Sequence, residues 1–210
     1  MNPTRILWIT HSFLEYRMPF YEALNKLFNN NLYLAYSNSR VPERCINKIT
    51  PSLEKNALCL EKEKHISFGN TKSDFSCSSI SIPYPSGLSK LLSSVDADIV
   101  IGEGFFQWTP WALMYSLSKK IPLLLTYEGT VHTERHYPSW RTVYKRLINH
   151  FVSGYLVNGS LCRQYLQNQI KAQDKIIIEG IMAADSKNLS FRCAERAYEG
   201  IQNIILKHHQ

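Results

Sequence analysis

The chain has 210 residues, of which 44% are hydrophobic and 20% are charged, as is typical of a globular domain with a filled core. Its most apolar stretch, residues 105–125, contains two lysines, a glutamine and two prolines, which excludes a membrane-spanning helix. The N-terminus lacks the apolar run of a signal peptide, so we predict a cytoplasmic protein. The formal net charge of +7 favours an anionic partner.

The five cysteines lie far apart and include no C-x-x-C pair. Neither a disulfide framework nor a zinc module has this spacing, so the pattern predicts reduced thiols.

The first 37 residues show the alternation of a βαβ unit. Residues 5–10 are a short apolar run, and residues 31–37 are a second one. Between them, the apolar residues of segment 18–28 recur at i, i+4, i+7 and i+8, and Pro19 suits the first turn of a helix. The order predicted is strand, helix, strand.

Residues 38–79 show no sustained hydrophobic period, and we expect an irregular insertion there. Residues 79–85 are predicted to form a short strand, followed by a small helix near residues 87–94.

The alternation of apolar runs and helical patterns then resumes. The predicted elements are strands at 97–103, 121–127, 154–159 and 175–180, with helices at 109–119, 139–151 and 160–170. Because the strands are continuously apolar, both faces of the sheet should be covered by helices. We predict a Rossmann-like, doubly wound α/β domain with a mostly parallel sheet over residues 1–185, and a linker or terminal helix over 186–210.

The loops that follow the predicted strands concentrate ionisable side chains. In a doubly wound sheet, ligands bind beyond the carboxyl ends of the strands, where these loops lie. Neither a G-x-G-x-x-G nor a G-x-x-x-x-G-K-[ST] sequence is present, so dinucleotide and ATP- or GTP-phosphate loops of those kinds are not expected. The candidate residues in the loops are His11, Glu15, Arg17, Glu103, Glu128, His132, Glu134, Arg135 and His136.

Glu128 is the candidate general acid or base, because it directly follows a predicted buried strand and precedes Gly129, which lets a ligand approach the backbone. A structural ion pair with a nearby arginine is the alternative. His132 and His136 have the spacing of a zinc pair, but the H-E-x-x-H pattern requires glutamate where Thr133 stands. We therefore predict no metal.

The helix over residues 139–151 is amphipathic and basic. We expect its apolar side to pack on the sheet and its basic residues to face outward, as on an ordinary surface helix. A second interpretation is that the basic face contacts anionic lipid at the inner face of a membrane. No nucleic-acid-binding module is recognised. The apolar set is Trp140, Val143, Tyr144, Leu147, Ile148 and Phe151, and the basic set is Arg141, Lys145 and Arg146.

The opening ILWITHSFLEYRMPFYEALNKL, with its R-x-P-F-x-x-A-L pattern, resembles the start of family 4 glycosyltransferases of the GT-B fold. The segments DADIVIGEGFFQWTPWAL, IPLLLTYEGTVHTERHYPSWRTVYKRL, SGYLVNGSLCRQYL and KIIIEGIMAADS are similar, in order, to the rest of that family's N-terminal domain. The resemblance covers nearly the whole chain except residues 38–79.

The resemblance implies transfer of a sugar from a nucleotide-sugar donor, with retention of configuration and without a cofactor or required metal. The N-terminal domain of such enzymes mainly binds acceptor, and the C-terminal domain binds the nucleotide sugar. Many members carry a histidine where Glu128 stands here, which departs from the family pattern. Carried over by position, His11 and Arg17 would line the first loop, and Glu103 with Gly104 would help form the acceptor side. From the placement of the loop after residues 121–127, we also expect Gly129, His132 and Arg135 to contact acceptor.

The family's second domain carries a glutamate pair separated by seven residues that contacts the donor, and no plausible copy of that pair occurs here. We therefore expect the acceptor-binding half of a retaining hexosyltransferase-type enzyme, acting on a sugar or lipid-linked acceptor in polysaccharide or glycolipid assembly. It would be inactive without a donor-binding domain, which a separate chain could supply. The alternatives are a non-enzymatic sugar- or lipid-binding module and, third, a metal-dependent hydrolase.

Overall fold

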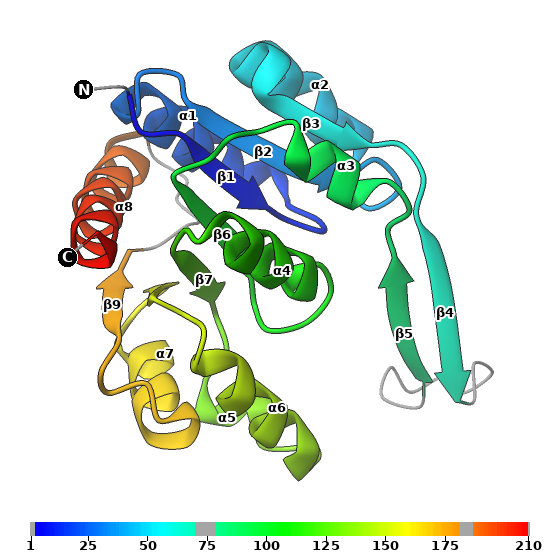
Figure 1. The fold of residues 1–210 in the computed structure, drawn as a ribbon, viewed down its shortest axis with the longest axis vertical. Coiled ribbons are helices and arrows are strands. Elements are labelled where there is room, and N and C mark those ends of the chain that lie inside the picture. The colour runs from blue at the N-terminus through cyan, green and yellow to red at the C-terminus, as the bar shows by residue number, and fades with distance from the viewer. Residues whose placement is uncertain (1–2, 70–78, 181–186, 210) are drawn as a thin grey trace.

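Seven parallel strands form one sheet in the computed structural model, which describes residues 3–69, 79–180 and 187–209. Their order is β3-β2-β1-β6-β7-β8-β9, and the chain therefore forms the predicted Rossmann-like α/β fold (Figure 1). The strands are β1 (Ile6–Ile9), β2 (Leu32–Ser37), β3 (Ala57–Leu60), β6 (Ile99–Glu103), β7 (Leu123–Tyr127), β8 (Gly154–Val157) and β9 (Ile176–Glu179).

Successive side chains of each strand enter two different cores, one on each face of the sheet. In β1, Ile6 and Trp8 belong to one core, whereas Leu7 and Ile9 belong to the other. This explains why the strands read as continuous apolar runs. The first face is covered by α1 (Met18–Leu27), α2 (Glu43–Leu53) and α8 (Lys187–His208), and the second by α3 (Leu88–Ser93), α4 (Thr109–Lys119), α6 (Ser139–Asn149) and α7 (Ser160–Tyr165).

The short elements are 3-10 turns at Glu15–Arg17 and Glu54–Asn56, the one-turn helix α5 (Val131–Glu134) and a π-helical turn at Leu166–Ile170 that continues α7. The predicted helix over 160–170 is thus α7 followed by this wider turn.

Helix α1 fixes the position of Arg17, which lies at its N-terminus. Pro19 occupies the first turn, where a missing backbone N–H costs nothing, and Phe20 and Leu24 are fully buried. Asn29 and Asn30 then adopt positive φ angles of 54° and 59°, a conformation that asparagine tolerates and that ends the helix. The chain enters α1 from β1 and leaves it toward β2, so Arg17 lies at the carboxyl edge of the sheet.

The expectation that residues 38–79 are irregular is wrong for the described part of that segment, which contains α2, β3 and β4 (Lys64–Gly69). Helix α2 buries only Cys45, Ile49 and Leu53, among polar residues and with Pro51 inside the helix. Strand β3 has four residues at the edge of the sheet. Such short, sparsely apolar elements carry too few periodic positions to stand out in the sequence.

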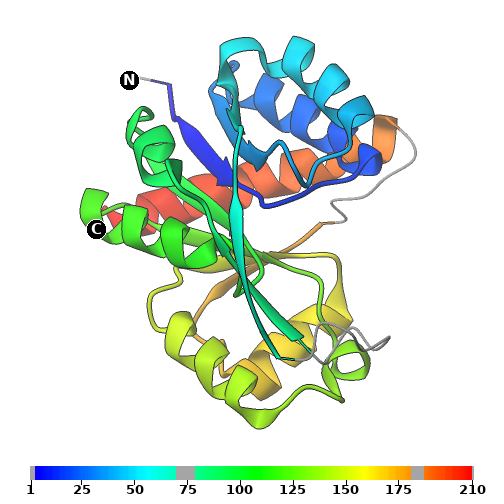
Figure 2. The ribbon, with the colours of Figure 1, turned by 90° about the vertical axis from the view of Figure 1, so that its right-hand side faces the viewer.

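The strand predicted at residues 79–85 does not continue the parallel series. It is β5 (Ser79–Tyr84), which pairs antiparallel with β4 in a separate two-stranded sheet. Figure 1 shows this hairpin standing clear of the helices, and Figure 2 shows it from the side on which it projects.

The C-terminal segment contains the predicted terminal helix, α8, which packs into the domain, whereas the predicted boundary at residue 185 lies outside the described residues. Helix α8 packs beside α1 (Figure 1), and its buried face includes Ala194, Ala197 and Ile201. Because these side chains complete the first core, residues 187–208 belong to the same folding unit.

Helix α6 is rotated relative to the prediction. Lys145 is buried together with Ile148 and Asn149, whereas Trp140 and Leu147 are exposed. Part of the predicted apolar face therefore points to solvent, and a predicted outward lysine points inward. The reason is tertiary, because Lys145 finds an anionic partner in the preceding helix.

Candidate functional site

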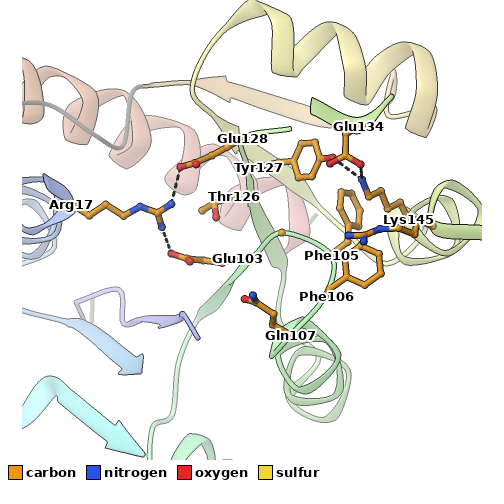
Figure 3. Close-up of a pocket in the computed structure, with 12 residues that line it drawn as sticks. Arg17, Glu103, Phe105, Phe106, Gln107, Thr126, Tyr127, Glu128, Glu134 and Lys145 are labelled. Carbon is orange, nitrogen blue, oxygen red and sulfur yellow. Dashed lines mark hydrogen bonds and ion pairs between the residues drawn. The ribbon is translucent and has the colours of Figure 1, made fainter. Parts of the chain in front are cut away.

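A cavity of about 310 Å³ opens at the carboxyl ends of β6 and β7, beside the N-terminus of α1 (Figure 3). This is the edge of the sheet where ligands bind in doubly wound folds. The lining residues are Arg17, Glu103, Gly104, Phe105, Phe106, Gln107, Thr126, Tyr127, Glu128, Glu134, Arg141 and Lys145.

Arg17 bridges two carboxylates that come from different strand ends. Its Nη1 donates to Oε1 of Glu103 at 2.5 Å, and its Nη2 donates to Oε1 of Glu128 at 2.7 Å (Figure 3). The Arg17 side chain is largely buried, as is Glu103, whereas Glu128 is 43% exposed. Arg17 thus holds the buried carboxylate of Glu103 in place and leaves the carboxylate of Glu128 partly exposed in the cavity.

The Glu103 carboxylate is held from the core side as well. Its Oε1 also accepts hydrogen bonds from the Trp8 indole and the Tyr21 hydroxyl, each at 3.3 Å. Burial raises the pKa of Glu103, and the charge of Arg17 together with hydrogen bonds from Thr10 and Trp8 acts in the opposite direction. Since Trp8 is fully buried in β1, the hydrophobic core positions this carboxylate directly.

The pKa of Arg17 is raised. Burial works against its charge, but the attraction of Glu103, with smaller contributions from Tyr21 and Glu128, outweighs that penalty. The guanidinium therefore stays protonated and supplies a fixed positive charge at the cavity.

Two glycines shape the loops of the cavity for different reasons. Gly104 adopts φ +63°, a conformation that favours glycine, and a side chain there would meet open space. Gly129 has no such angle, but a Cβ atom there would collide with the Tyr127 hydroxyl and lie 2.9 Å from Oε1 of Glu134. Gly129 thus permits the close approach of the Tyr127 ring, although it does not line the cavity.

A second ion-paired cluster lies at the opposite end of the cavity and surrounds Lys145. Its Nζ donates to Oε2 of Glu134 and to the Tyr127 hydroxyl at 2.8 Å (Figure 3). It also donates to the Tyr165 hydroxyl at 3.3 Å. The ammonium also lies 5.8 Å from the centre of the Phe105 ring. Burial lowers the pKa of Lys145, which Glu134 opposes, and burial raises the pKa of Tyr127 and of Tyr165.

This cluster ties α5 and α6 to β7 and α7. Sequence reasoning placed Lys145 on the outer face of its helix and did not select it. One signal was present: Glu134 is the only acidic residue between 129 and 173, among six lysines and arginines. A lone carboxylate in such a stretch predicts an ion pair, but the sequence does not say with which residue.

The predicted site residues fall into two groups. The structure brings Arg17, Glu103, Gly104 and Glu128 together around one cavity. His11, His132 and Arg135 do not line it.

His11 is buried beside the cavity loop. Its Nε2 lies 2.9 Å from Oε2 of Glu63, and its ring packs edge-on against Trp108. Glu63 also accepts from the Trp108 indole at 2.5 Å. This cluster anchors the start of the β4–β5 hairpin to the loop that precedes α4.

His132 and Arg135 are exposed at α5, which forms one helical turn capped by Thr130 and Thr133 where the sequence suggested a loop. The Nε atom of Arg135 donates to the His136 ring at 2.8 Å. In residues 3–69, 79–180 and 187–209, no three His, Cys, Asp or Glu side chains are grouped to hold a metal ion. Over the same ranges, no helix is long and apolar enough to cross a bilayer.

No protein-family model and no curated protein matches the sequence. Among solved structures, the chain is similar to HepE of Anabaena in complex with UDP and glucose, at 15% identity and a TM-score of 0.48, over 85% of this chain and 45% of that one. It is also similar to the glycosyltransferase of kitacinnamycin, at 9% identity and a TM-score of 0.40, over 85% of this chain and 52% of that one.

A designed cube-shaped protein cage, made by fusing symmetric oligomeric domains, matches at 9% identity and a TM-score of 0.33, over all of this chain and 76% of the cage chain. The chain thus spans about half the length of HepE and of the kitacinnamycin enzyme.

Proposed function

We propose that this chain is the acceptor-binding domain of a glycosyltransferase that takes its sugar from a nucleotide sugar. The observation that carries the proposal is the guanidinium of Arg17 held between Glu103 and Glu128 at the carboxyl edge of a parallel sheet. The ordered sequence resemblance to the N-terminal domain of family 4 glycosyltransferases points the same way.

The chemistry of the cavity suits a sugar. Carboxylates accept hydrogen bonds from hydroxyl groups, and Arg17 and Gln107 can donate to hydroxyl oxygens. The rings of Phe105 and Phe106 supply an apolar wall. A volume of about 310 Å³ lies at the small end of the range for small-molecule sites. Six of the twelve lining residues are charged, which suits a ligand rich in hydroxyl groups.

We assign the catalytic role on the acceptor side to Glu128, because it is the more exposed of the two carboxylates bound to Arg17. In the transfer, the acceptor hydroxyl oxygen forms a bond to the anomeric carbon of the donor on the face from which the diphosphate departs, so that the configuration is retained, and the bond from that carbon to the diphosphate breaks. The nucleoside diphosphate leaves with the bonding electrons, and Glu128 accepts the hydroxyl proton. Arg17 and Glu103 act as positioning residues for that carboxylate.

The donor nucleotide would bind a second domain, either further along a longer protein or on a separate chain. We therefore propose that the 210 residues alone bind acceptor but do not transfer sugar. The resemblance implies retention of configuration and no cofactor, and the acceptor class is a growing polysaccharide or glycolipid in the cytoplasm.

Binding and transfer can be tested separately. We expect the purified chain to bind a subset of sugars on a glycan array, and Glu128→Gln to weaken that binding at least about tenfold, the cost of one charge-assisted hydrogen bond. Leu206→Glu, on the exposed side of α8, is the matched control and should bind as the wild type does. Sugar transfer should require an added donor-binding domain.

Three results would count against the proposal. Saturable transfer by the 210-residue chain alone would disprove the need for a donor domain, while supporting a glycosyltransferase. If Glu128→Gln binds sugar as tightly as the wild type, the sugar does not bind at the assigned site. Binding that never leads to transfer with any donor domain would favour the non-enzymatic module instead.

A further inference from the structure

Helix α6 carries an exposed apolar stripe that the fold leaves uncovered. Trp140 is 50% exposed, Val143 65% and Leu147 59%, and Phe151, just beyond the helix, is 46% exposed. Their spacing of three, four and four residues places these side chains in one line along the helix. Trp140, Val143, Leu147 and Phe151 are called the α6 stripe below. The opposite side of the helix is already used, because Lys145, Ile148 and Asn149 are buried against the domain.

The part of the chain around the α6 stripe carries most of the protein's net positive charge. Between residues 129 and 173, six lysines and arginines face one acidic residue, a net charge of +5 out of the chain's +7. That acidic residue, Glu134, pairs with Lys145, and Arg163 pairs with Glu179 beyond the segment, so Arg135, Arg141, Arg146 and Lys171 carry the excess charge. Helix α6 contains no carboxylate, and Arg146 and His150 flank the stripe as exposed residues. The six basic residues are Arg135, Arg141, Lys145, Arg146, Arg163 and Lys171.

We propose that the α6 stripe docks on an anionic phospholipid bilayer, with the helix lying in the plane of the interface. An exposed tryptophan with aliphatic and aromatic neighbours, bordered by basic residues, is the pattern of an interfacial helix. A second copy of this chain is the less suitable occupant, since it would bring two surfaces of the same positive charge together. This assignment differs from the sequence interpretation, in which the basic face would have touched the lipid.

The α6 stripe continues into the cavity. Trp140 packs edge-on against Phe106, with ring centres 6.2 Å apart, and Phe106 lines the cavity. The guanidinium of Arg141 lies 4.3 Å from the centre of the Phe106 ring and lines the cavity as well. Docking through the stripe would therefore place the cavity mouth at the lipid surface. If the proposed function holds, an acceptor carried on a lipid anchor reaches Glu128 from that side.

Vesicle sedimentation tests the docking without any transfer assay. The 210-residue protein is mixed with phosphatidylcholine vesicles, with and without phosphatidylglycerol. We expect binding only to the anionic vesicles, and weaker binding as salt is raised, because the charge contribution is screened. The double variant Val143→Glu, Leu147→Glu should lower the partition coefficient by more than about tenfold, since two apolar side chains no longer enter the bilayer.

The matched control is Leu206→Glu on α8, an equally exposed leucine outside the stripe, which should bind vesicles as the wild type does. Circular dichroism of each variant verifies that the fold is kept. Absence of binding to anionic vesicles, or binding that the double variant leaves unchanged, would overturn the proposal. A dimer that the same double variant dissociates would also overturn it and assign the stripe to a second copy.

Trp140 provides a second readout that does not depend on a destabilising substitution. Of the four tryptophans, Trp8 and Trp108 are buried, Trp111 on α4 is half-buried, and Trp140 is exposed, so a blue shift of fluorescence on adding anionic vesicles should come from Trp140. The Trp140→Phe variant should keep vesicle binding and lose the shift. A shift that persists in that variant would show that another surface enters the lipid.

Discussion

Two ion-paired clusters lie at opposite ends of one cavity and differ in how far solvent reaches them. Around Lys145, the ammonium and the carboxylate of Glu134 are both buried, with two tyrosine hydroxyls completing the contacts. Around Arg17, one carboxylate is buried and the other, on Glu128, is 43% exposed. Both clusters contain a cation and a glutamate, yet only the second presents a charged group with room to bind something else.

Burial decides the role of each of these charge pairs. A buried, fully partnered pair holds elements together, because separating its members leaves an uncompensated charge. A partly exposed pair supported from the core can exchange one contact for a ligand at little cost. The Lys145 cluster is therefore assigned to structure and the Arg17 cluster to the proposed reaction.

The largest effect on stability is expected from Lys145→Met. The substitution leaves Glu134 buried without its cation, and we expect the free energy of unfolding to fall by about 3–5 kcal/mol. Urea unfolding followed by circular dichroism measures the change. The double variant Lys145→Met, Glu134→Gln removes both charges and should recover much of the loss. A single variant as stable as the wild type would show that the cluster does not hold the fold.

A smaller loss of stability, together with loss of function, is expected from Arg17→Met. Glu103 would lose its cation but keep the Trp8 and Tyr21 donors, so we expect a fall of about 2–3 kcal/mol in the free energy of unfolding. Binding of sugar acceptor should be lost, because Glu128 is no longer held at the cavity. Arg17→Lys is the control that keeps the positive charge. It should restore neither contact fully, because an ammonium cannot bridge two carboxylates as a guanidinium does. If Arg17→Met still binds acceptor, the contacts of Arg17 with Glu103 and Glu128 are not needed for acceptor binding.

The raised pKa of Tyr127, in the cluster around Lys145, predicts how stability depends on pH. Burial, with the charge of Glu134, raises the pKa of Tyr127 in the folded protein. Its contribution is therefore fully present below about pH 10, the unfolded pKa, and is lost as the pH rises above that value. We expect the free energy of unfolding to fall above about pH 10 by up to about 1.4 kcal/mol per pH unit more than in Tyr127→Phe. Urea unfolding between about pH 9 and 11 measures both slopes, and equal slopes would contradict the assignment.

The smallest effect on stability is expected from Glu128→Gln, the variant that weakens acceptor binding. Its side chain is partly exposed, so the free energy of unfolding should change by less than about 1 kcal/mol. The same chemical change at Glu134 should be clearly more destabilising, because that carboxylate is buried against Lys145. Calorimetric titration with an acceptor sugar and urea unfolding, applied to both variants, test the contrast. An equal loss of stability in Glu128→Gln and Glu134→Gln would contradict the distinction between the two clusters.

Much of the candidate site follows from where strands end. Glu103 and Glu128 each stand at or just after the last residue of an apolar run, and parallel strands bring such positions to one edge of the sheet. Arg17 precedes a helix whose start Pro19 marks. The sequence could not show that one guanidinium reaches both carboxylates, since they lie 86 and 111 residues away along the chain.

The residues that sequence reasoning misplaced are those whose environment comes from distant contacts. Lys145 has the local pattern of a surface lysine, and only its partners in β7, α5 and α7 turn it inward. That rotation sends Trp140 and Leu147 to solvent and creates the α6 stripe. Likewise, the sequence of β5 resembles that of the other predicted strands. Its antiparallel pairing with β4 places it in a separate sheet, and the sequence pattern does not show that pairing.

The alternation of strands and helices follows from the order of residues alone, because hydrophobic periodicity is a local property. The parallel sheet and the edge that holds Arg17, Glu103 and Glu128 follow from that alternation. Three features are set only in the folded chain: the buried face of α6, the place of the β4–β5 hairpin and the packing of α8 that completes the core. Those features depend on ion pairs, strand pairing and packing between residues far apart in the chain, whose energies no local window contains.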